Sequence, residues 1–229
     1  MKRKDVFKFL LIIFWVFVIG SIIGYIVETI VAIVQNGHFT SRQGLLYGPL
    51  IPVYGAGLVI YYLVIAKIKD EGNLKIFLIT MLLGGIVEYL FSFFQEKFFG
   101  TVSWDYSNLW FNINGRTSLL HCLYWGTGGV LFVKYIYPFI EKLIGKIDML
   151  ALKHITLVLM VLLFFDICIS CVAANRQQER TVGIEANSNL DRFCDEHYPD
   201  SVMDYIYSNK IVKWIYWIIY LFILFVILV

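Results

Sequence analysis

The stretch RQGLLYGPLIPVYGAG, Arg42–Gly57, is the part of the sequence around which the rest of the chain is expected to be arranged. It places one arginine, two tyrosines, two prolines and four glycines directly before a hydrophobic run. Irregular backbone beside a membrane is stable only where protein or a watery cavity surrounds it. We therefore expect a re-entrant or capping element at a binding site. The alternative is a turn that only starts a helix, since proline is common in a first helical turn.

The composition is that of an integral membrane protein. Hydrophobic residues make up 59% of the 229 residues and charged residues 16%, with a mean hydropathy of +0.74. Soluble domains have about 45–50% apolar and about 25% charged residues. The net charge of +2 and the lack of a basic stripe argue against nucleic-acid binding.

A membrane-spanning helix needs about 20 mostly apolar residues. We expect residues 1–229 to form one all-α membrane domain, a polytopic helical bundle with five spans and a sixth at the C-terminus. The basic N-terminus suggests a signal peptide, but the uncharged run from Phe9 to Val27 is longer than the roughly 7–15-residue core of a cleaved signal, so we expect a retained span. The expected spans are Phe7–Val34, Pro49–Ala66, Leu74–Phe94, Leu119–Tyr137, Ile155–Ala173 and Ile211–Val229.

Basic residues indicate the orientation, because short cytoplasmic loops carry an excess of Lys and Arg. They precede the first span and lie between spans two and three and between spans four and five. We expect a multi-pass cell-membrane protein with a cytoplasmic N-terminus. The Arg42–Gly57 stretch and the loops 95–118 and 174–210 would then lie outside.

The four cysteines have no metal-ligand spacing, and we expect no metal and no cofactor. A Cys171–Cys194 disulfide is expected only if that side of the membrane is oxidising.

Two glutamates lie within expected spans. Charge inside a membrane costs roughly 2.5–3.5 kcal/mol on insertion scales, so it usually faces the bundle interior and marks a functional site. Glu28 lies near the outer end of the first span. Glu88 lies in the third span and is followed by Ser92 and Gln95. The alternative is that each glutamate pairs with an arginine to hold the bundle together, and both interpretations can hold. Asp166, with Ser170 one turn later, is a weaker third case.

The loop TVSWDYSNLWFNINGRTSLLH (101–121) is the second dense motif. Its aromatic residues suit a belt at the lipid headgroups, while its polar residues exceed what a belt needs. Asn114-Gly115 is a turn signal, and Thr117 or Ser118 could cap the helix that follows. A lone histidine such as His121 is more often a core residue than a base. Near Arg42, however, Arg116 and His121 would form a cationic pocket for a phosphate or carboxylate.

These motifs carry a family resemblance. The strings R-x-G-L-L-Y-G-P-x-x-P-x-Y-G, E-Y, W-D-Y-S and N-x-x-G-R-x-S-L, in this order, resemble the bacterial CmpB-like family of type IV ABC-transporter permeases. The resemblance covers residues 20–129 and implies a transport component. The chain has no P-loop, so any ATPase would be a separate chain. By the resemblance, the characteristic positions are Glu28, Arg42, Gly44, Tyr47, Gly48, Pro49, Pro52, Tyr54, Gly55, Glu88, Trp104, Asp105, Tyr106, Asn112, Gly115 and Arg116.

Three functions remain open from the sequence. We favour a transporter or permease component with an outward-facing polar pocket for a small anionic or lipid-like ligand, since prolines, glycines and buried carboxylates are typical of broken transporter helices. One alternative is an intramembrane enzyme acting on a lipid or cell-wall precursor, with Glu28 or Glu88 as general base; the other is a structural or regulatory membrane protein. Membrane lipid, a second copy and a separate ATPase are the expected partners. The expected ligand-binding residues are Glu28, Arg42, Tyr47, Tyr54, Glu88, Asp105, Tyr106, Asn112, Arg116 and His121, and no catalytic residue is assigned.

Overall fold

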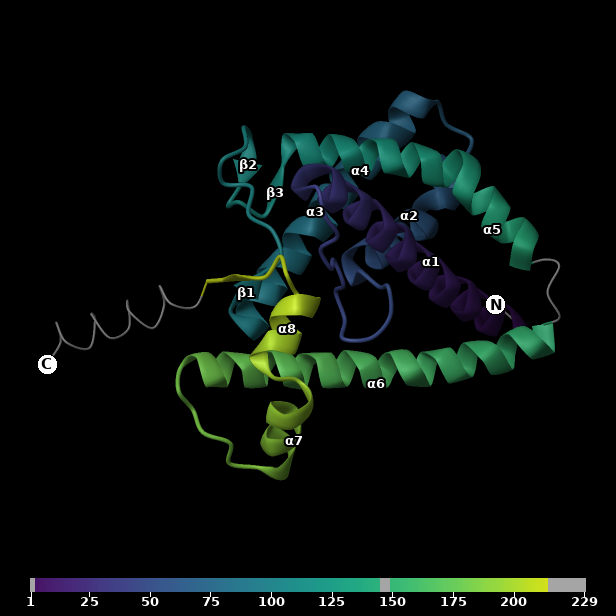
Figure 1. The fold of residues 1–229 in the computed structure, drawn as a ribbon. Coiled ribbons are helices and arrows are strands. Elements are labelled where there is room, and N and C mark those ends of the chain that lie inside the picture. Colours follow the sequence, from purple (N-terminus) through teal and green to yellow (C-terminus); the bar gives the residue numbers. More distant parts are fainter. Residues whose placement is uncertain (1–2, 145–148, 214–229) are drawn as a thin grey trace, which may run out of the picture.

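The computed structural model describes residues 3–144 and 149–213, and helices dominate this part of the chain (Figure 1). The fold class expected from the sequence is therefore confirmed as helical. The strands are four two-residue segments: β1 (Thr101–Val102), β2 (Asn112–Ile113), β3 (Thr117–Ser118) and β4 (Ile211–Val212). The helices are α1 (Arg3–Asn36), α2 (Pro52–Ile68), α3 (Asn73–Phe99), α4 (Leu119–Leu131), α5 (Tyr137–Ile144), α6 (Met149–Thr181), α7 (Asn189–His197) and α8 (Asp200–Ile206).

Three of these helices are long and apolar enough to cross a membrane. They are α1 over Phe9–Asn36, α3 over Asn73–Phe99 and α6 over Leu152–Thr181. The two other helical spans expected before the C-terminus coincide with the shorter α2 and with α4. A π-helical turn, η1 (Phe132–Ile136), joins α4 to α5 and extends that helical segment to Ile144.

The expected C-terminal span does not begin with a helix at Ile211. Ile211 and Val212 were expected to start a helix but form β4, which pairs antiparallel with β1 through Val102 and Thr101. The Lys213 backbone N–H also donates to the Gly100 carbonyl oxygen at 2.8 Å, so pairing with a distant segment overrides the apolar pattern. Residues 214–229 of the expected span lie outside the described residues. The expected loop 174–210 contains the end of α6 and the short helices α7 and α8.

Consecutive helices pack against one another from α1 to α4. Their core is centred on the fully buried Tyr61, whose hydroxyl donates to the Thr80 carbonyl oxygen at 2.9 Å and to that of Trp125 at 3.1 Å. Glycine allows the closest approaches, because a Cβ at Gly24 would lie 2.3 Å from Cγ of Tyr54. The Tyr54 ring, which packs against Gly24, also contacts the Trp125 ring, with ring centroids 5.3 Å apart.

Helix α6 runs along the lower side of the molecule in Figure 1 and touches the bundle near both of its ends. At one end, Trp15 Nε1 donates to Thr156 Oγ1 at 2.9 Å. At the other end, α7 and α8 pack on α6, and Arg176 binds Asp195 through two hydrogen bonds of 2.9 Å each.

Cys194 is buried in this packing and Cys171 is exposed on α6; both thiols are free. The Cys171–Cys194 disulfide considered from the sequence is therefore not formed.

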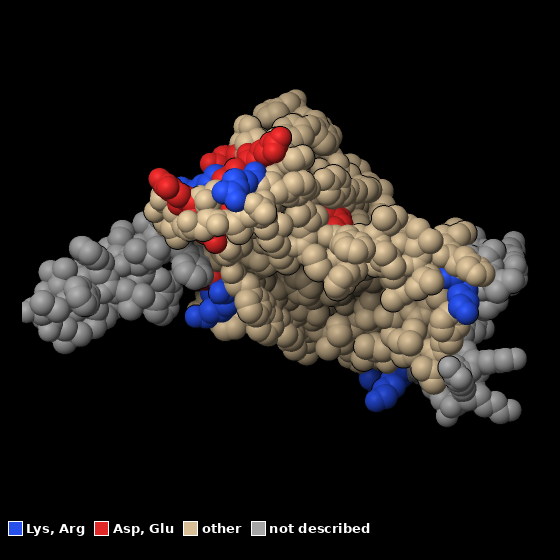
Figure 2. Space-filling view, turned by 90° about the horizontal axis from the view of Figure 1, so that it is seen from below, with Lys and Arg blue, Asp and Glu red and all other residues tan. Residues whose placement is uncertain are grey.

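The charge distribution agrees with a membrane protein. On the face shown in Figure 2, charged side chains gather towards two ends, with both signs at one end and only Lys and Arg at the other. The broad surface between them is almost entirely uncharged, apart from one small acidic patch.

Candidate functional site

The Arg42–Gly57 stretch consists of two parts that meet at Pro52. Pro52 is the first residue of α2, so the alternative of a helix start is correct for the second half. The first half is an irregular loop folded onto α6. The Leu46 backbone N–H donates to Ser170 Oγ at 2.9 Å, and the Tyr47 N–H donates to Asp166 Oδ1 at 3.1 Å. Polar side chains of α6 therefore hold the backbone of this loop.

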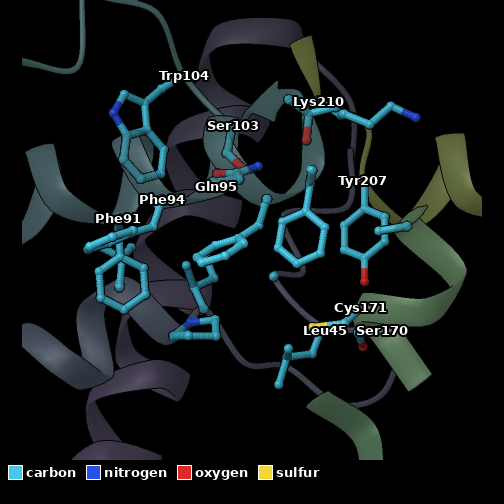
Figure 3. Close-up of a pocket in the computed structure, with 18 of the residues that line it drawn as sticks. Leu45, Phe91, Phe94, Gln95, Ser103, Trp104, Ser170, Cys171, Tyr207 and Lys210 are labelled. Atoms are coloured by element: carbon cyan, nitrogen blue, oxygen red, sulfur yellow. The ribbon is translucent and has the colours of Figure 1, made fainter. Parts of the chain in front are cut away.

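A groove of about 340 Å³ opens between this loop, α3 and α6 (Figure 3). Its walls are mainly aromatic and aliphatic, and its polar groups come from α3, α6 and the segments after α3 and α8. The apolar lining includes Leu45, Pro52, Phe91, Phe94, Phe98, Phe99, Trp104 and Ala174. The polar lining includes Gln95, Ser103, Ser170, Gln177, Gln178, Tyr207 and Lys210.

Most polar side chains of the groove form hydrogen bonds with other side chains of the protein. Gln95 and Ser103 exchange hydrogen bonds of 3.0 and 3.1 Å. Lys210 Nζ donates to Gln177 Oε1 at 2.7 Å and to Asp204 at 3.1 Å. Burial raises the pKa of Tyr207 to about 12, so its hydroxyl remains a neutral hydrogen-bonding group. Mostly neutral, preformed polar groups beside a large apolar wall suit an amphipathic ligand better than a compact ion.

A second feature, here named the carboxylate cluster, consists of Glu28, Tyr54, Glu88, Tyr106 and Thr117. The Tyr54 hydroxyl donates to Glu28 Oε1 at 2.5 Å. Glu88 is 6% exposed and accepts hydrogen bonds from the Tyr106 hydroxyl at 3.2 Å and from the Thr117 hydroxyl at 2.6 Å. Both glutamates therefore accept hydrogen bonds from neutral hydroxyl groups. Within the described residues neither is paired with an arginine, so the alternative of Glu–Arg pairs that hold the bundle together is wrong.

The loop between α3 and α4 supplies Tyr106 and Thr117 to this cluster through a tight hairpin. Asn114 and Gly115 both have positive φ angles, of 54° and 67°, and connect β2 to β3, as the turn signal predicted. Ser118 caps α4 by accepting from the His121 N–H. Asn112 stabilises the loop, because its Oδ1 accepts from the Gly115 N–H at 3.0 Å.

Arg116 and Asp105 make ion pairs at the edge of this loop. Arg116 Nη2 lies 2.6 Å from Glu96 Oε2. Asp105 contacts Lys213 and Ser107, and these hydrogen bonds lower the pKa of Asp105 to about 2. Both charges are thus neutralised within the protein.

The expected cationic pocket is divided in the structure. Arg116 is paired with Glu96, and the ring of His121 stacks on Tyr106 with centroids 3.6 Å apart. Within the described part of the chain, no hydrogen bond or ion pair joins Arg42 to either residue, and Arg42 Nε is buried without a partner. Tyr47 contacts a different part of the chain, because its hydroxyl lies 2.8 Å from that of Tyr198.

None of the ten residues expected to bind a ligand lines the groove. The sequence did offer one signal, since Gln95 follows Glu88 by seven positions and shares its face of α3. Ser170 was noted only as a neighbour of Asp166. Lys210 and Tyr207 gave no signal, because only the packing of α8 brings them to the groove.

The long apolar helices, the uncharged middle surface and the buried carboxylates define a helical membrane protein. Within that class, the chain belongs to the family described as "Putative ABC-transporter type IV", whose model matches residues 15–171. The resemblance noted in the motifs is thereby confirmed, and the match extends into α6 as far as Asp166 and Ser170. Comparisons with curated proteins and with solved structures give no match.

Proposed function

We propose that this protein is the membrane-embedded, ligand-binding component of a transport system. Its ligand is an amphipathic, lipid-like molecule held in the groove between α3, α6 and the loop before α2. The family membership supports the transport role. The groove supports the choice of ligand, and it is the observation that carries the proposal.

The lining of the groove matches the two parts of such a molecule. Phe91, Phe94 and Phe98 come from successive turns of α3 and offer a continuous apolar wall for a hydrocarbon chain. Gln95, Ser103 and Gln177 can orient a polar headgroup through hydrogen bonds. Phe94 and Phe98 are 49% and 70% exposed, so the groove is open to a ligand arriving from the lipid.

In this proposal the protein lies in the cell membrane with its N-terminus in the cytoplasm. Helices α2 and α4–α5 then cross together with α1, α3 and α6. This placement is supported by the basic residues at the start of α1, before its apolar part, and by those around the connection from α2 to α3, Lys67, Lys69 and Lys75. The groove then opens in the outer half of the membrane.

A separate ATPase subunit supplies the energy in this proposal, and a second copy of the chain is a further partner. The enzyme alternative needs a free cation beside a carboxylate. It is less well supported, because Arg116 is already paired with Glu96.

The experiment is a comparison of Ala174→Phe, which fills the groove, with Val161→Phe on the exposed face of the same helix. Ala174 lines the groove, whereas Val161 is 47% exposed and does not line it. Each protein is purified in mild detergent, and the amphiphiles that remain bound are quantified by mass spectrometry. We expect wild type and Val161→Phe to retain the same class of molecule and Ala174→Phe to lose most of it.

The transport arm uses membrane vesicles from cells that express each variant, since such vesicles also contain any partner. Movement of the retained molecule across the vesicle membrane should fall to the vector-only level in Ala174→Phe alone. Equal retention and equal transport in all three proteins would refute the proposal.

A further inference from the structure

The charge that borders the groove is balanced within the protein. Lys210 is the one charged residue among the described residues that line the groove. Its Nζ lies 3.1 Å from Asp204 Oδ1, and Gln177 Nε2 donates to the same oxygen at 2.9 Å. Gln177 Oε1 in turn accepts from Lys210 Nζ at 2.7 Å. The three side chains therefore form a closed set in which one cation balances one anion.

A charged headgroup would find no free counter-charge among the described residues of the groove. An anionic headgroup would have to compete with Asp204 for Lys210, and a cationic headgroup would meet no carboxylate on the described lining. A charge that leaves water without a partner is costly to bury. The balance of charges therefore favours an uncharged headgroup.

Three glutamines supply hydrogen-bonding groups to the groove. A glutamine amide has two N–H donors and two acceptor lone pairs. Gln95 uses one donor and one acceptor on Ser103, and Gln177 uses one of each in the closed set. Each of these two amides thus keeps one donor and one acceptor. Gln178 also lines the groove, and within the described part of the chain its side chain has no hydrogen-bond partner.

The glutamine amides match the hydrogen-bonding capacity of hydroxyl groups. A hydroxyl group both donates and accepts, as a glutamine amide does. An ionised phosphate or carboxylate only accepts, and an ammonium group only donates. A headgroup with several hydroxyl groups can therefore use the donors and the acceptors that the three amides leave available.

The Trp104 ring adds a flat aromatic surface to the groove. Its Nε1–H donates to the Arg116 carbonyl oxygen at 2.8 Å, and the ring stacks on Tyr106 with centroids 6.5 Å apart. These contacts fix the orientation of the ring. Figure 3 shows Gln95 between Trp104 on one side and Lys210 on the other. A fixed aromatic ring can pack against the C–H groups of a sugar ring, because its π face is electron-rich.

We propose that the ligand of the groove carries an uncharged headgroup with several hydroxyl groups, which is the chemistry of a sugar. The headgroup binds the three glutamines and packs on Trp104, while the hydrocarbon chain lies on the phenylalanines of α3. This assignment rests on the proposed function, because it names the headgroup of the ligand proposed there. It separates the ligand from phospholipids, whose ionised phosphate accepts hydrogen bonds but donates none.

Protection of Cys171 from a neutral, membrane-permeant maleimide compares headgroups directly. The full-length protein in liposomes is incubated with decyl glucoside, decyl phosphate, decylphosphocholine or decyltrimethylammonium, each below the concentration at which it forms micelles. Cys171 lines the groove and Cys168 on the same helix does not, so the ratio of their labelling rates corrects for unequal partitioning and surface charge. We expect decyl glucoside to lower this ratio at lower concentrations than the three charged amphiphiles.

Two variants test the residues that are assigned to the headgroup. In Gln178→Leu, the concentration of decyl glucoside that halves the ratio should rise about 2- to 13-fold, the effect of losing one hydrogen bond between neutral groups. Trp104→Leu should also raise this concentration. The matched controls Gln35→Leu and Trp110→Leu, at exposed positions that do not line the groove, should leave it unchanged. Gln178→Leu decides the test if Trp104→Leu does not fold.

The outcomes separate the headgroup from the proposed function. Equal protection by all four amphiphiles, or stronger protection by a charged one, would overturn the sugar headgroup and leave the ligand groove in place. Equal protection of wild type and Gln178→Leu by decyl glucoside would also overturn it. If none of the four amphiphiles protects Cys171, the proposed function is refuted together with the headgroup.

Discussion

Replacing Ser170 by alanine should release the loop before α2 from helix α6. Ser170 Oγ accepts a hydrogen bond from the Leu46 N–H at 2.9 Å and donates one to Asp166 Oδ1 at 3.2 Å. Leu46 and Ser170 are 4% and 5% exposed, so water cannot easily replace the serine. Leaving a buried donor unsatisfied costs about 1–3 kcal/mol. Since each 1.4 kcal/mol is a factor of ten, the loop should open about 5- to 140-fold more often.

Hydrogen exchange followed by mass spectrometry measures this opening directly. A peptide covering residues 44–50 should exchange faster by that factor in Ser170→Ala, while peptides from α2 should be unchanged. Ser201→Ala on the exposed surface of α8 is the matched control. If Ser170→Ala and Ser201→Ala exchange at the wild-type rate in this peptide, hydrogen bonds to α6 do not hold the loop.

Three further predictions concern the loop between α3 and α4 and the packing of α7 on α6. Gly115→Ala should lower the thermal stability, because φ at this position is +67° and the new Cβ would lie 2.5 Å from Asp105 Oδ1. The control Gly128→Ala should leave the thermal stability unchanged, because the space around Gly128 is open. Hydrogen bonds from Lys213 and Ser107 lower the pKa of Asp105 to about 2 in the folded state. The stability from these contacts is therefore complete above the ordinary pKa of 3.8 and is lost as the pH falls towards 2, and acid denaturation of Asp105→Asn should lack that component. Arg176→Met should weaken the packing of α7 on α6, visible as faster hydrogen exchange of α7, because it removes the cation that binds Asp195 of α7. Wild-type exchange in α7 would refute that last prediction.

Much of the fold could be predicted because its signals are local. Apolar runs of sufficient length marked the helices, Asn114-Gly115 marked the hairpin, and Ser118 marked the start of α4. The Arg42–Gly57 stretch was recognised from its helix breakers alone. Each of these features depends on the backbone preferences of neighbouring residues, which a sequence carries directly.

The remaining features depend on contacts between distant parts of the chain. Ile211 and Val212 have an apolar, β-branched pattern that suits a helix in a membrane as well as a strand, and only the presence of β1 decides between them. Arg116 was expected beside Arg42, but Glu96, twenty residues before it, is the closer partner. The groove could not be predicted, because its polar groups come from α3, α6 and the segment after α8.

The accessibility of two cysteines on α6 tests the proposed ligand groove most directly. Cys171 lines the groove, whereas Cys168 is exposed on the same helix and does not line it. A membrane-permeant maleimide is applied to the protein with and without the amphiphile that copurifies with it, and labelling at each cysteine is measured by peptide mass spectrometry. The amphiphile should slow the labelling of Cys171 and leave that of Cys168 unchanged. Equal rates at Cys171 with and without the amphiphile, or equal slowing at both cysteines, would contradict a specific ligand site in the groove.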